Sequence, residues 1–149
     1  MIKVFVTGAS GFVGQRLVSA LDTKNNTLRV LSRGNLPGIE TVVCDLQSRD
    51  IPDDALMGIN TVFHLAGIAH DSTKQDSQYH AVNVRATVKL AELAAVSGVE
   101  RFVFVSSVKA GGNLLTGSCM TESDQAKPEG IYGRTKREAE LKLLAIGRQ

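Results

Sequence analysis

The sequence lacks the features of a secreted, membrane-spanning or metal-binding protein. It has only two cysteines, Cys44 and Cys119, in 149 residues, and neither has metal-ligand spacing or an evident disulfide partner. No apolar run reaches the roughly 18 residues that a membrane-spanning helix needs. Glycine and polar residues interrupt the first apolar run too early for a signal peptide. We therefore expect a cytoplasmic protein with reduced thiols, no membrane contact and no bound metal.

Clustered charge of one sign is also absent. The 17 basic and 15 acidic residues give a net charge of +2, and the basic ones are scattered along the chain, which argues against a nucleic-acid partner. Repeats, low-complexity tracts and interdomain linkers are missing too. Because 43% of the residues are hydrophobic, we expect one domain with its own core over residues 1–149.

The most informative segment that is present is the glycine-spaced loop of residues 7–14. An apolar run, residues 2–6, leads into it, and apolar residues then recur every four positions from Val13 to Leu21, which is typical of a helix face. Such a turn lets the backbone approach a pyrophosphate and aims the helix N-terminus at it. A tight turn without a ligand is the alternative. The position between a strand and a helix favours a dinucleotide site formed by Gly8, Gly11 and Gly14.

Apolar strand-like runs alternate with helical segments along the chain. We predict strands at residues 2–6, 27–31, 40–44, 61–65 and 101–105, with helices after the glycine loop and at residues 53–57, 78–97 and 131–146. Strands that are apolar on both faces and separated by helices indicate a parallel sheet covered on both sides. The predicted fold class is therefore α/β, a doubly wound parallel sheet of the Rossmann type that binds ligands at the carboxyl ends of its strands.

Tyr132, Lys136 and Ser107 form the candidate catalytic group. The tyrosine and the lysine are four residues apart, so a helix places them on one face. A free tyrosine ionises near a pH of about 10, and a neighbouring ammonium favours the phenolate. Ser107, after the fifth strand, would hydrogen-bond the substrate oxygen whose proton Tyr132 gives or takes. Such a pair is also common on solvated helices, but the glycine loop and the serine pair upstream favour catalysis.

Together these segments resemble the short-chain dehydrogenase/reductase superfamily, and within it the NAD-dependent epimerase/dehydratase family, which largely handles nucleotide sugars. The matching pieces span nearly the whole chain: residues 7–14, Asp45-Leu46, residues 63–67, Asn83, Ser106-Ser107 and residues 132–136. The separation of Ser107 and Tyr132 also resembles the spacing in sugar-nucleotide epimerases.

The resemblance implies a role for each matching residue. Gly8, Gly11 and Gly14 would cradle the pyrophosphate, beside backbone N–H groups of Phe12 and Val13; Asp45 and Leu46 would contact the adenine, and Ala66 and Gly67 would line the nicotinamide-side ribose. Tyr132 would be the acid/base, Lys136 its pKa tuner and a ribose ligand, and Ser107 the partner of the substrate oxygen. Asn83 resembles a helix asparagine that supports this site, although an ordinary role in the helix is equally open.

Two departures from the family pattern bear on the reaction. The second strand ends in Ser32-Arg33, whereas relatives that prefer NAD commonly carry an acidic residue there. A guanidinium suits a 2′-phosphate, so we expect both residues to contact the cofactor and NADP(H) to be preferred over NAD(H), unless Arg33 is simply solvated. Val108-Lys109 lacks the acid that 4,6-dehydratases place after the catalytic hydroxyl residue. The expected function is therefore epimerisation or 4-keto reduction of a nucleotide-activated sugar, and a non-catalytic NAD(P)-binding sensor or scaffold is the alternative.

The resemblance also implies a longer enzyme and a dimer. Relatives continue into a further strand and a substrate-binding region, so we expect this chain to be an N-terminal portion, truncated before that region and inactive alone. The helices at residues 78–97 and 131–146 resemble a pair that forms a four-helix homodimer interface, although they could pack within one chain instead. Of the histidines, we expect His64 in the core and His70 and His80 in solvent. Glu122 resembles a residue of a pocket-shaping loop.

Overall fold

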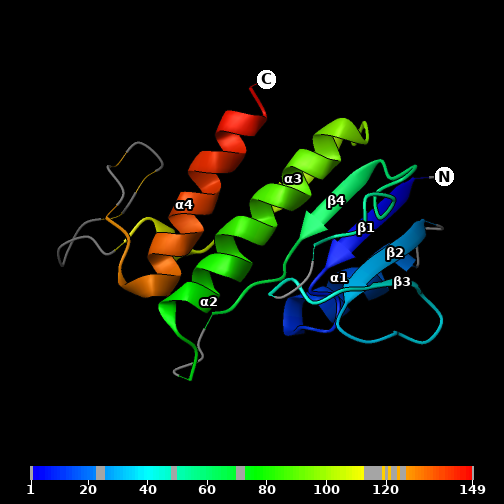
Figure 1. Ribbon diagram of the computed structural model, residues 1–149, viewed down its shortest axis with the longest axis horizontal. Coiled ribbons are helices and arrows are strands. Elements are labelled where there is room, and N and C mark those ends of the chain that lie inside the picture. Colours follow the sequence, from blue (N-terminus) through cyan, green and yellow to red (C-terminus); the bar gives the residue numbers. More distant parts are fainter. Residues whose placement is uncertain are drawn as a thin grey trace.

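Five parallel strands form a sheet in the order β3-β2-β1-β4-β5 in the computed structural model (Figure 1), which describes residues 2–22, 26–47, 50–69, 73–112, 119, 121, 124 and 127–148. The strands are β1 (Lys3–Thr7), β2 (Thr27–Ser32), β3 (Glu40–Val43), β4 (Thr61–His64) and β5 (Arg101–Phe104). The chain runs outward from β1 to β3 and then returns to β4 on the other side of β1. The carboxyl ends of β1 and β4 therefore flank the point where the strand order reverses, which is where open α/β sheets bind ligands.

The central strand β1 is buried on both faces, which explains its continuous apolar run. Val4 and Val6 point to one side and pack with Val30 of β2. Phe5 points to the other side and packs with Val62 of β4. A strand between two layers of helices must be apolar at successive positions, whereas a half-exposed strand would alternate.

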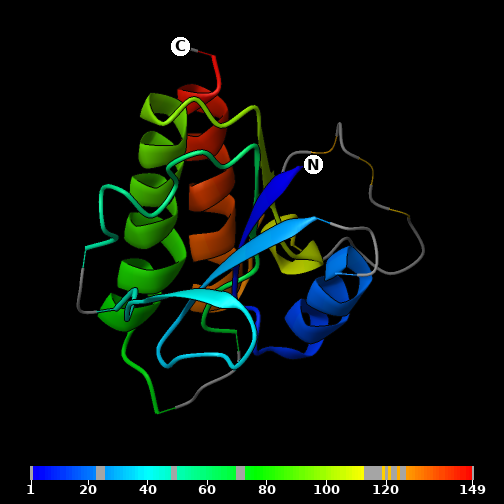
Figure 2. The same cartoon turned by 90° about the vertical axis from the view of Figure 1, so that its right-hand side faces the viewer.

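Helices cover both faces of the sheet. One face carries α1 (Phe12–Asp22). Its apolar stripe of Leu17, Val18 and Leu21 packs on the cluster that contains Val4, Val6 and Val30. The other face carries a continuous helical rod, α2 (Asp76–His80), the π-helical η1 (Ala81–Ala86) and α3 (Thr87–Val96), with α4 (Gly130–Ile146) beside it (Figures 1 and 2). A single 3₁₀ turn, η2 (Val108–Ala110), follows β5. The doubly wound Rossmann-type fold is confirmed.

The predicted helix at residues 53–57 is wrong. This segment forms successive turns with hydrogen bonds from Ala55 N to Pro52 O and from Met57 N to Asp54 O, both at 3.0 Å. Such bonds link residues three apart, whereas an α-helix links residues four apart. Gly58 then takes a positive φ of 72°, which ends the segment before a helical register can form.

The other predicted elements are confirmed, with small shifts at their ends. β1 lies one residue later than expected, β3 to β5 each end one residue earlier, and α4 begins one residue earlier. The predicted long helix begins at Asp76 and contains the π-helical segment η1, which hydrophobic spacing does not reveal. Within the described residues, none of the helices has the length and apolar character to cross a bilayer.

Candidate active site

The glycine loop follows β1 directly, and two of its glycines are required by the fold itself. Gly8 has a φ of 72°, and a Cβ there would lie 2.7 Å from Ala66 N. A Cβ on Gly14 would lie 2.0 Å from Gly8 O. Side chains at these positions would separate β1 from β4 and α1 from the loop.

Gly11 is different, because the fold leaves space beside it. Apart from its chain neighbours, a Cβ on Gly11 would approach only Gly8 O among the described atoms, at 3.2 Å. Helix α1 begins at the next residue, and the N–H groups of a first helical turn have no acceptor within the helix. Phe12 and Val13 are 88% and 56% exposed, so this first turn lies at the surface. A pyrophosphate fits this arrangement of bare backbone and helix N-terminus.

The predicted adenosine contacts lie at the same edge of the sheet. Ser32 ends β2, and its carbonyl accepts a hydrogen bond from Cys44 N at 2.9 Å, which keeps the ends of β2 and β3 together. Arg33 follows and is exposed. Asp45 is partly buried, and its Oδ1 accepts a hydrogen bond from Gln47 N at 3.0 Å, which fixes the turn after β3.

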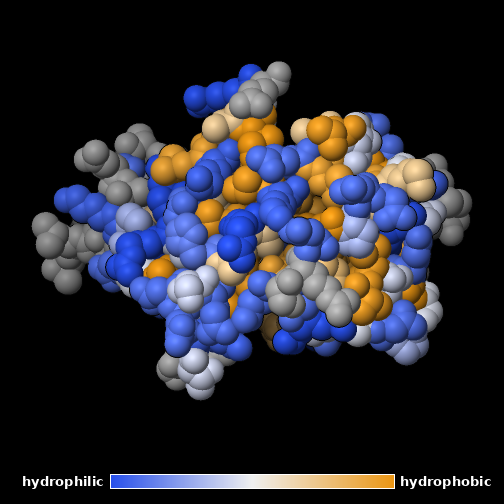
Figure 3. All heavy atoms as spheres, viewed as in Figure 1, coloured by the Kyte–Doolittle hydropathy of each residue, from blue (hydrophilic) through white to orange (hydrophobic). Residues whose placement is uncertain are grey.

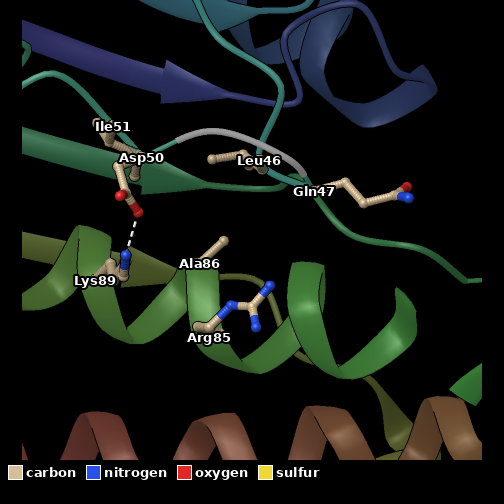
Figure 4. A pocket seen from close by; sticks show the side chains of 7 residues that line it. All are labelled: Leu46, Gln47, Asp50, Ile51, Arg85, Ala86 and Lys89. Carbon is tan, nitrogen blue, oxygen red and sulfur yellow. Dashed lines mark hydrogen bonds and ion pairs between the residues drawn. The ribbon is translucent and has the colours of Figure 1, made fainter. Parts of the chain in front are cut away.

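A hollow of about 290 Å³ opens beside Leu46 (Figure 4). Leu46 and Gln47 face Arg85 of η1 across it, and Lys89 of α3 forms an ion pair with Asp50 at its other end. No sequence pattern predicts Arg85 at this hollow, because its position on η1 opposite the end of β3 depends on the packing of the helix.

The segment after β4, where Ala66 and Gly67 lie, is held by the side chain of Asn83 in η1. Asn83 is 1% exposed; its Oδ1 accepts a hydrogen bond from Ile68 N at 2.8 Å, and its Nδ2 donates to Ile68 O at 2.9 Å and to Thr135 Oγ1 of α4 at 3.1 Å. A Cβ on Gly67 would lie 3.1 Å from Asn83 Oδ1. These contacts join the segment after β4 to α4.

His64 belongs to the core, as predicted, and its hydrogen bonds define its tautomer. Thr87 Oγ1 donates its one hydrogen to Asn83 O at 2.9 Å, so at 2.8 Å from His64 Nε2 it accepts. Nε2 therefore carries the proton, and Nδ1 accepts from Thr7 Oγ1 at 2.6 Å. Thr7 Oγ1 in turn accepts from Ala66 N at 3.2 Å. A buried chain of polar groups thus runs from the end of β1 to η1.

This histidine is neutral in the folded protein. Burial, followed by repulsion from the nearby Lys136 ammonium, lowers the pKa of His64 to about 3. A neutral imidazole is what the assigned tautomer requires, since a doubly protonated ring could not accept from Thr7.

Lys136 lies on α4 and reaches the end of β5. Lys136 is only 4% exposed. Its Nζ donates to Val105 O at 2.6 Å and lies 3.8 Å from the centre of the Phe104 ring. The ring face and the carbonyl both favour a cation. Burial nevertheless lowers the pKa of Lys136 to about 8, against the opposing effect of the Glu140 carboxylate.

The structure brings the other two predicted catalytic residues to the same corner. Tyr132 is partly buried on α4, one helical turn before Lys136 and on the same face. Ser107 follows β5 and caps η2, where its Oγ accepts a hydrogen bond from Lys109 N at 3.2 Å. The two segments pack closely, because a Cβ on Gly133 would lie 2.4 Å from Lys109 O. Only a glycine after Tyr132 allows this approach.

The remaining predicted residues lie away from this corner or outside the described part of the chain. His80 is exposed on α2, as expected, and its Nε2 lies 2.7 Å from Glu138 Oε2. His70 and Glu122 fall outside the described residues. Among those that are described, no group of three or more histidine, cysteine, aspartate or glutamate side chains is placed to hold a metal ion.

The fold and the location of these residues define a class of protein, a dinucleotide-binding domain of the short-chain dehydrogenase/reductase type. More specifically, the chain belongs to the NAD dependent epimerase/dehydratase family, whose model matches residues 4–149.

Curated relatives and solved structures agree with this assignment. The chain is 32% identical to a UDP-glucose 4-epimerase of Vibrio cholerae, over 98% of this chain and 47% of the relative. It is 34% identical to a 3 beta-hydroxysteroid dehydrogenase/Delta 5-->4-isomerase of Mycobacterium tuberculosis, over 96% of this chain and 42% of the relative. Among solved structures, MoeE5 in complex with UDP-glucose and NAD is 36% identical and superposes with a TM-score of 0.89, covering 99% of this chain and 50% of that one. The chain therefore spans about half the length of the relatives it matches.

Proposed function

We propose that residues 1–149 form the cofactor-binding and acid/base part of an NAD(P)-dependent epimerase or 4-keto reductase that acts on a nucleotide-activated sugar. The observation that carries this proposal is the buried Lys136 ammonium, bonded to Val105 O one helical turn from Tyr132. A sensor or scaffold has no chemical need for this cation or for Ser107 beside it. The similarity to a UDP-glucose 4-epimerase and to MoeE5 bound to UDP-glucose supports a sugar nucleotide as the substrate.

In this proposal the chain's own residues move and hold a proton. Tyr132, one helical turn from the Lys136 ammonium, would take a proton from a substrate hydroxyl or return it to a ketone. Ser107 Oγ, held by Lys109 N, hydrogen-bonds the same substrate oxygen. When bound, the nicotinamide supplies or receives the hydride.

The cofactor would lie along the carboxyl edge of the sheet. The bare backbone at Gly11 and the N–H groups of Phe12 and Val13 would hold its pyrophosphate, and Asp45 and Leu46 its adenine. We propose that NADP(H) binds more tightly than NAD(H), because the exposed Arg33 occupies the position where a carboxylate would repel a 2′-phosphate. The related MoeE5 structure contains NAD.

Calorimetric titration of this chain with both cofactors tests the binding half of the proposal. We expect NADPH to bind about tenfold or more tightly than NADH, since a charge-assisted contact to a phosphate contributes about 1.5–3 kcal/mol. No heat with either cofactor, on folded protein, would overturn the cofactor assignment. Arg101→Ala, at the opposite edge of the sheet, is the matched control for Arg33→Ala.

The reaction itself is tested in a full-length enzyme that contains this chain. We would mix this enzyme with a 4-keto sugar nucleotide and NADPH and follow the absorbance of the reduced nicotinamide. The absorbance should fall if the enzyme is a reductase and show no net loss if it is an epimerase. Tyr132→Phe should abolish either activity. Retention of activity in Tyr132→Phe would exclude the proposed acid/base chemistry.

We also propose that the outer faces of α3 and α4 form a homodimer interface. Val96, Leu141 and Leu144 are 83%, 53% and 57% exposed, and apolar side chains are visible at the C-terminal ends of both helices (Figure 3). Exposed apolar side chains on neighbouring helices are typical of an association surface. Analytical ultracentrifugation should show a dimer that the double variant Leu141→Lys/Leu144→Lys converts to a monomer.

A further inference from the structure

Glu140 joins α4 to the strand end that carries the candidate catalytic serine. Its two carboxylate oxygens have different partners. Oε1 accepts a hydrogen bond from Ser106 Oγ, in the residue before Ser107. Oε2 accepts one from Arg137 Nη1 at 2.9 Å. The side chain is 24% exposed, so this contact is partly shielded from water.

The same carboxylate favours the ammonium form of Lys136, against the effect of burial on its pKa. Residues four apart on a helix lie on one face, with about 5–6 Å between their Cβ atoms. The groups that β4 and the end of β5 place near the Lys136 ammonium are uncharged. They are the carbonyl of Val105, the ring of Phe104 and the neutral imidazole of His64.

The helices that pack on this part of α4 add no second carboxylate at the Lys136 ammonium among the contacts of the described residues. Asn83 and Thr87 of the helical rod are neutral, and their side chains are occupied by the hydrogen bonds given above. Lys109 of η2 contributes its backbone carbonyl next to Gly133, and its own side chain is cationic and exposed. On α4 itself the titratable or charged neighbours are Tyr132, Arg137 and Glu140.

We propose that Glu140 is a positioning residue of the candidate active site, whose carboxylate ties α4 to the end of β5 through Ser106 and serves as the counter-charge of the Lys136 ammonium. Removing that charge takes away one of the groups that oppose the effect of burial, so that Lys136 loses its proton at a lower pH. A neutral Lys136 would leave the site beside Tyr132 without its positive charge. This consequence for catalysis rests on the proposed function, whereas the charge on Lys136 can be measured without any ligand.

The decisive variant is Glu140→Gln, which keeps an oxygen to accept from Ser106 Oγ while removing the charge. The readout is the pH titration of the Lys136 side chain by NMR of its ¹³Cε signal, assigned with Lys136→Arg. We expect the pKa of Lys136 to fall by about one pH unit, the order expected for loss of a nearby unit charge in a partly shielded site. Ser106→Ala, which keeps the charge but loses the tie, should give a smaller fall.

Glu138→Gln is the matched control on the same helix. Glu138 lies two residues from Lys136, and its carboxylate contacts His80 and Lys142 at 2.7 and 3.8 Å instead. The pKa of Lys136 should be unchanged in this variant. An unchanged pKa in folded Glu140→Gln, or an equal fall in Glu138→Gln, would overturn the charge role. An unchanged pKa in Ser106→Ala would overturn the tie.

If Glu140→Gln does not fold, Glu140→Asp gives a second test of the same role. Glu140→Asp keeps the charge but withdraws it by one methylene from Ser106, and it should lower the pKa of Lys136 by less than the loss of the charge would. A wild-type value in Glu140→Asp would contradict the proposal. Because the titration needs neither cofactor nor substrate, its failure is distinguishable from failure of the proposed enzyme function.

Discussion

Replacing Gly11 and Gly14 separately by alanine should separate cofactor binding from folding. At Gly14 the new Cβ would lie 2.0 Å from Gly8 O and 2.8 Å from Ala9 Cα, both backbone atoms that cannot turn aside. Overpacking of this kind costs about 1–3 kcal/mol. For a chain of this size, we expect a fall in Tm of about 2–10 °C.

At Gly11 the fold itself would tolerate the methyl group. Its one close contact, 3.2 Å from Gly8 O, needs a shift of a few tenths of an ångström. The unfolded chain loses flexibility in the same substitution, which offsets about 0.4–1 kcal/mol. The stability of Gly11→Ala should therefore stay within about 1 kcal/mol of the wild type.

Cofactor binding, unlike stability, should be sensitive to the methyl group of Gly11→Ala. A phosphate oxygen accepts from backbone N–H at about 2.7–2.9 Å, whereas a methyl carbon requires about 3.5 Å. The methyl of Gly11→Ala would thus displace the pyrophosphate and remove at least one charge-assisted hydrogen bond, about 1.5–3 kcal/mol or 10–150-fold in affinity.

Thermal unfolding and calorimetric titration with NADPH measure the two effects on the same samples. Gly147→Ala, at the far end of α4, where a Cβ would make an ordinary 3.5 Å contact, is the control for a harmless glycine replacement. Wild-type affinity in folded Gly11→Ala would refute the placement of the pyrophosphate at this loop.

Three further predictions concern the buried histidine and the cofactor. Stability should fall as the pH drops below 6.5, because unfolded histidine takes up a proton there while folded His64, with a pKa of about 3, does not; the slope from this residue is at most about 1.4 kcal/mol per pH unit. Urea unfolding at several pH values should show that slope, and His64→Gln should flatten it. Thr87→Val leaves the Nε2 proton of His64 without its acceptor, so it should cost about 1–3 kcal/mol in the same assay at neutral pH; an unchanged free energy of unfolding would contradict the His64–Thr87 hydrogen bond. Arg33→Ala should weaken NADPH about tenfold or more and leave NADH unchanged, and equal effects on both cofactors would show that Arg33 does not contact a 2′-phosphate.

The strands and the glycine loop could be predicted because their causes are local. β1 is buried on both faces, and its continuous apolar run indicates that burial directly. The positive φ of Gly8 and the close approach at Gly14 are satisfied by glycine alone. The helix predicted at residues 53–57 was wrong, because this segment forms turns between Pro52 and Gly58. Composition alone does not distinguish such turns from a short helix.

The partners of the site residues could not be predicted, because they are distant in the sequence. Thr7 meets His64, and Ser106 meets Glu140, only after β1 has paired with β4 and α4 has packed on β5. Single-sequence patterns contain neither pairing. Spacing along α4 is local by contrast: Tyr132 and Lys136, like Lys136 and Glu140, are four residues apart and share a helix face.

These distant contacts have a common arrangement that bears on how the site works. Thr7 accepts from Ala66 N at the glycine-loop end of the sheet, and through His64 and Thr87 it is linked to Asn83 O of η1. Asn83 of η1 then bonds both the segment after β4 and Thr135, three residues beyond Tyr132. All of these groups are buried and bonded, so displacing one leaves its neighbour with an unmet hydrogen bond in a site of low dielectric. The segment that we propose to lie beside the nicotinamide and the helix of Tyr132, the proposed acid/base, are therefore held in one frame. A substitution that breaks the hydrogen bonds of His64 should then disturb cofactor binding as well as stability.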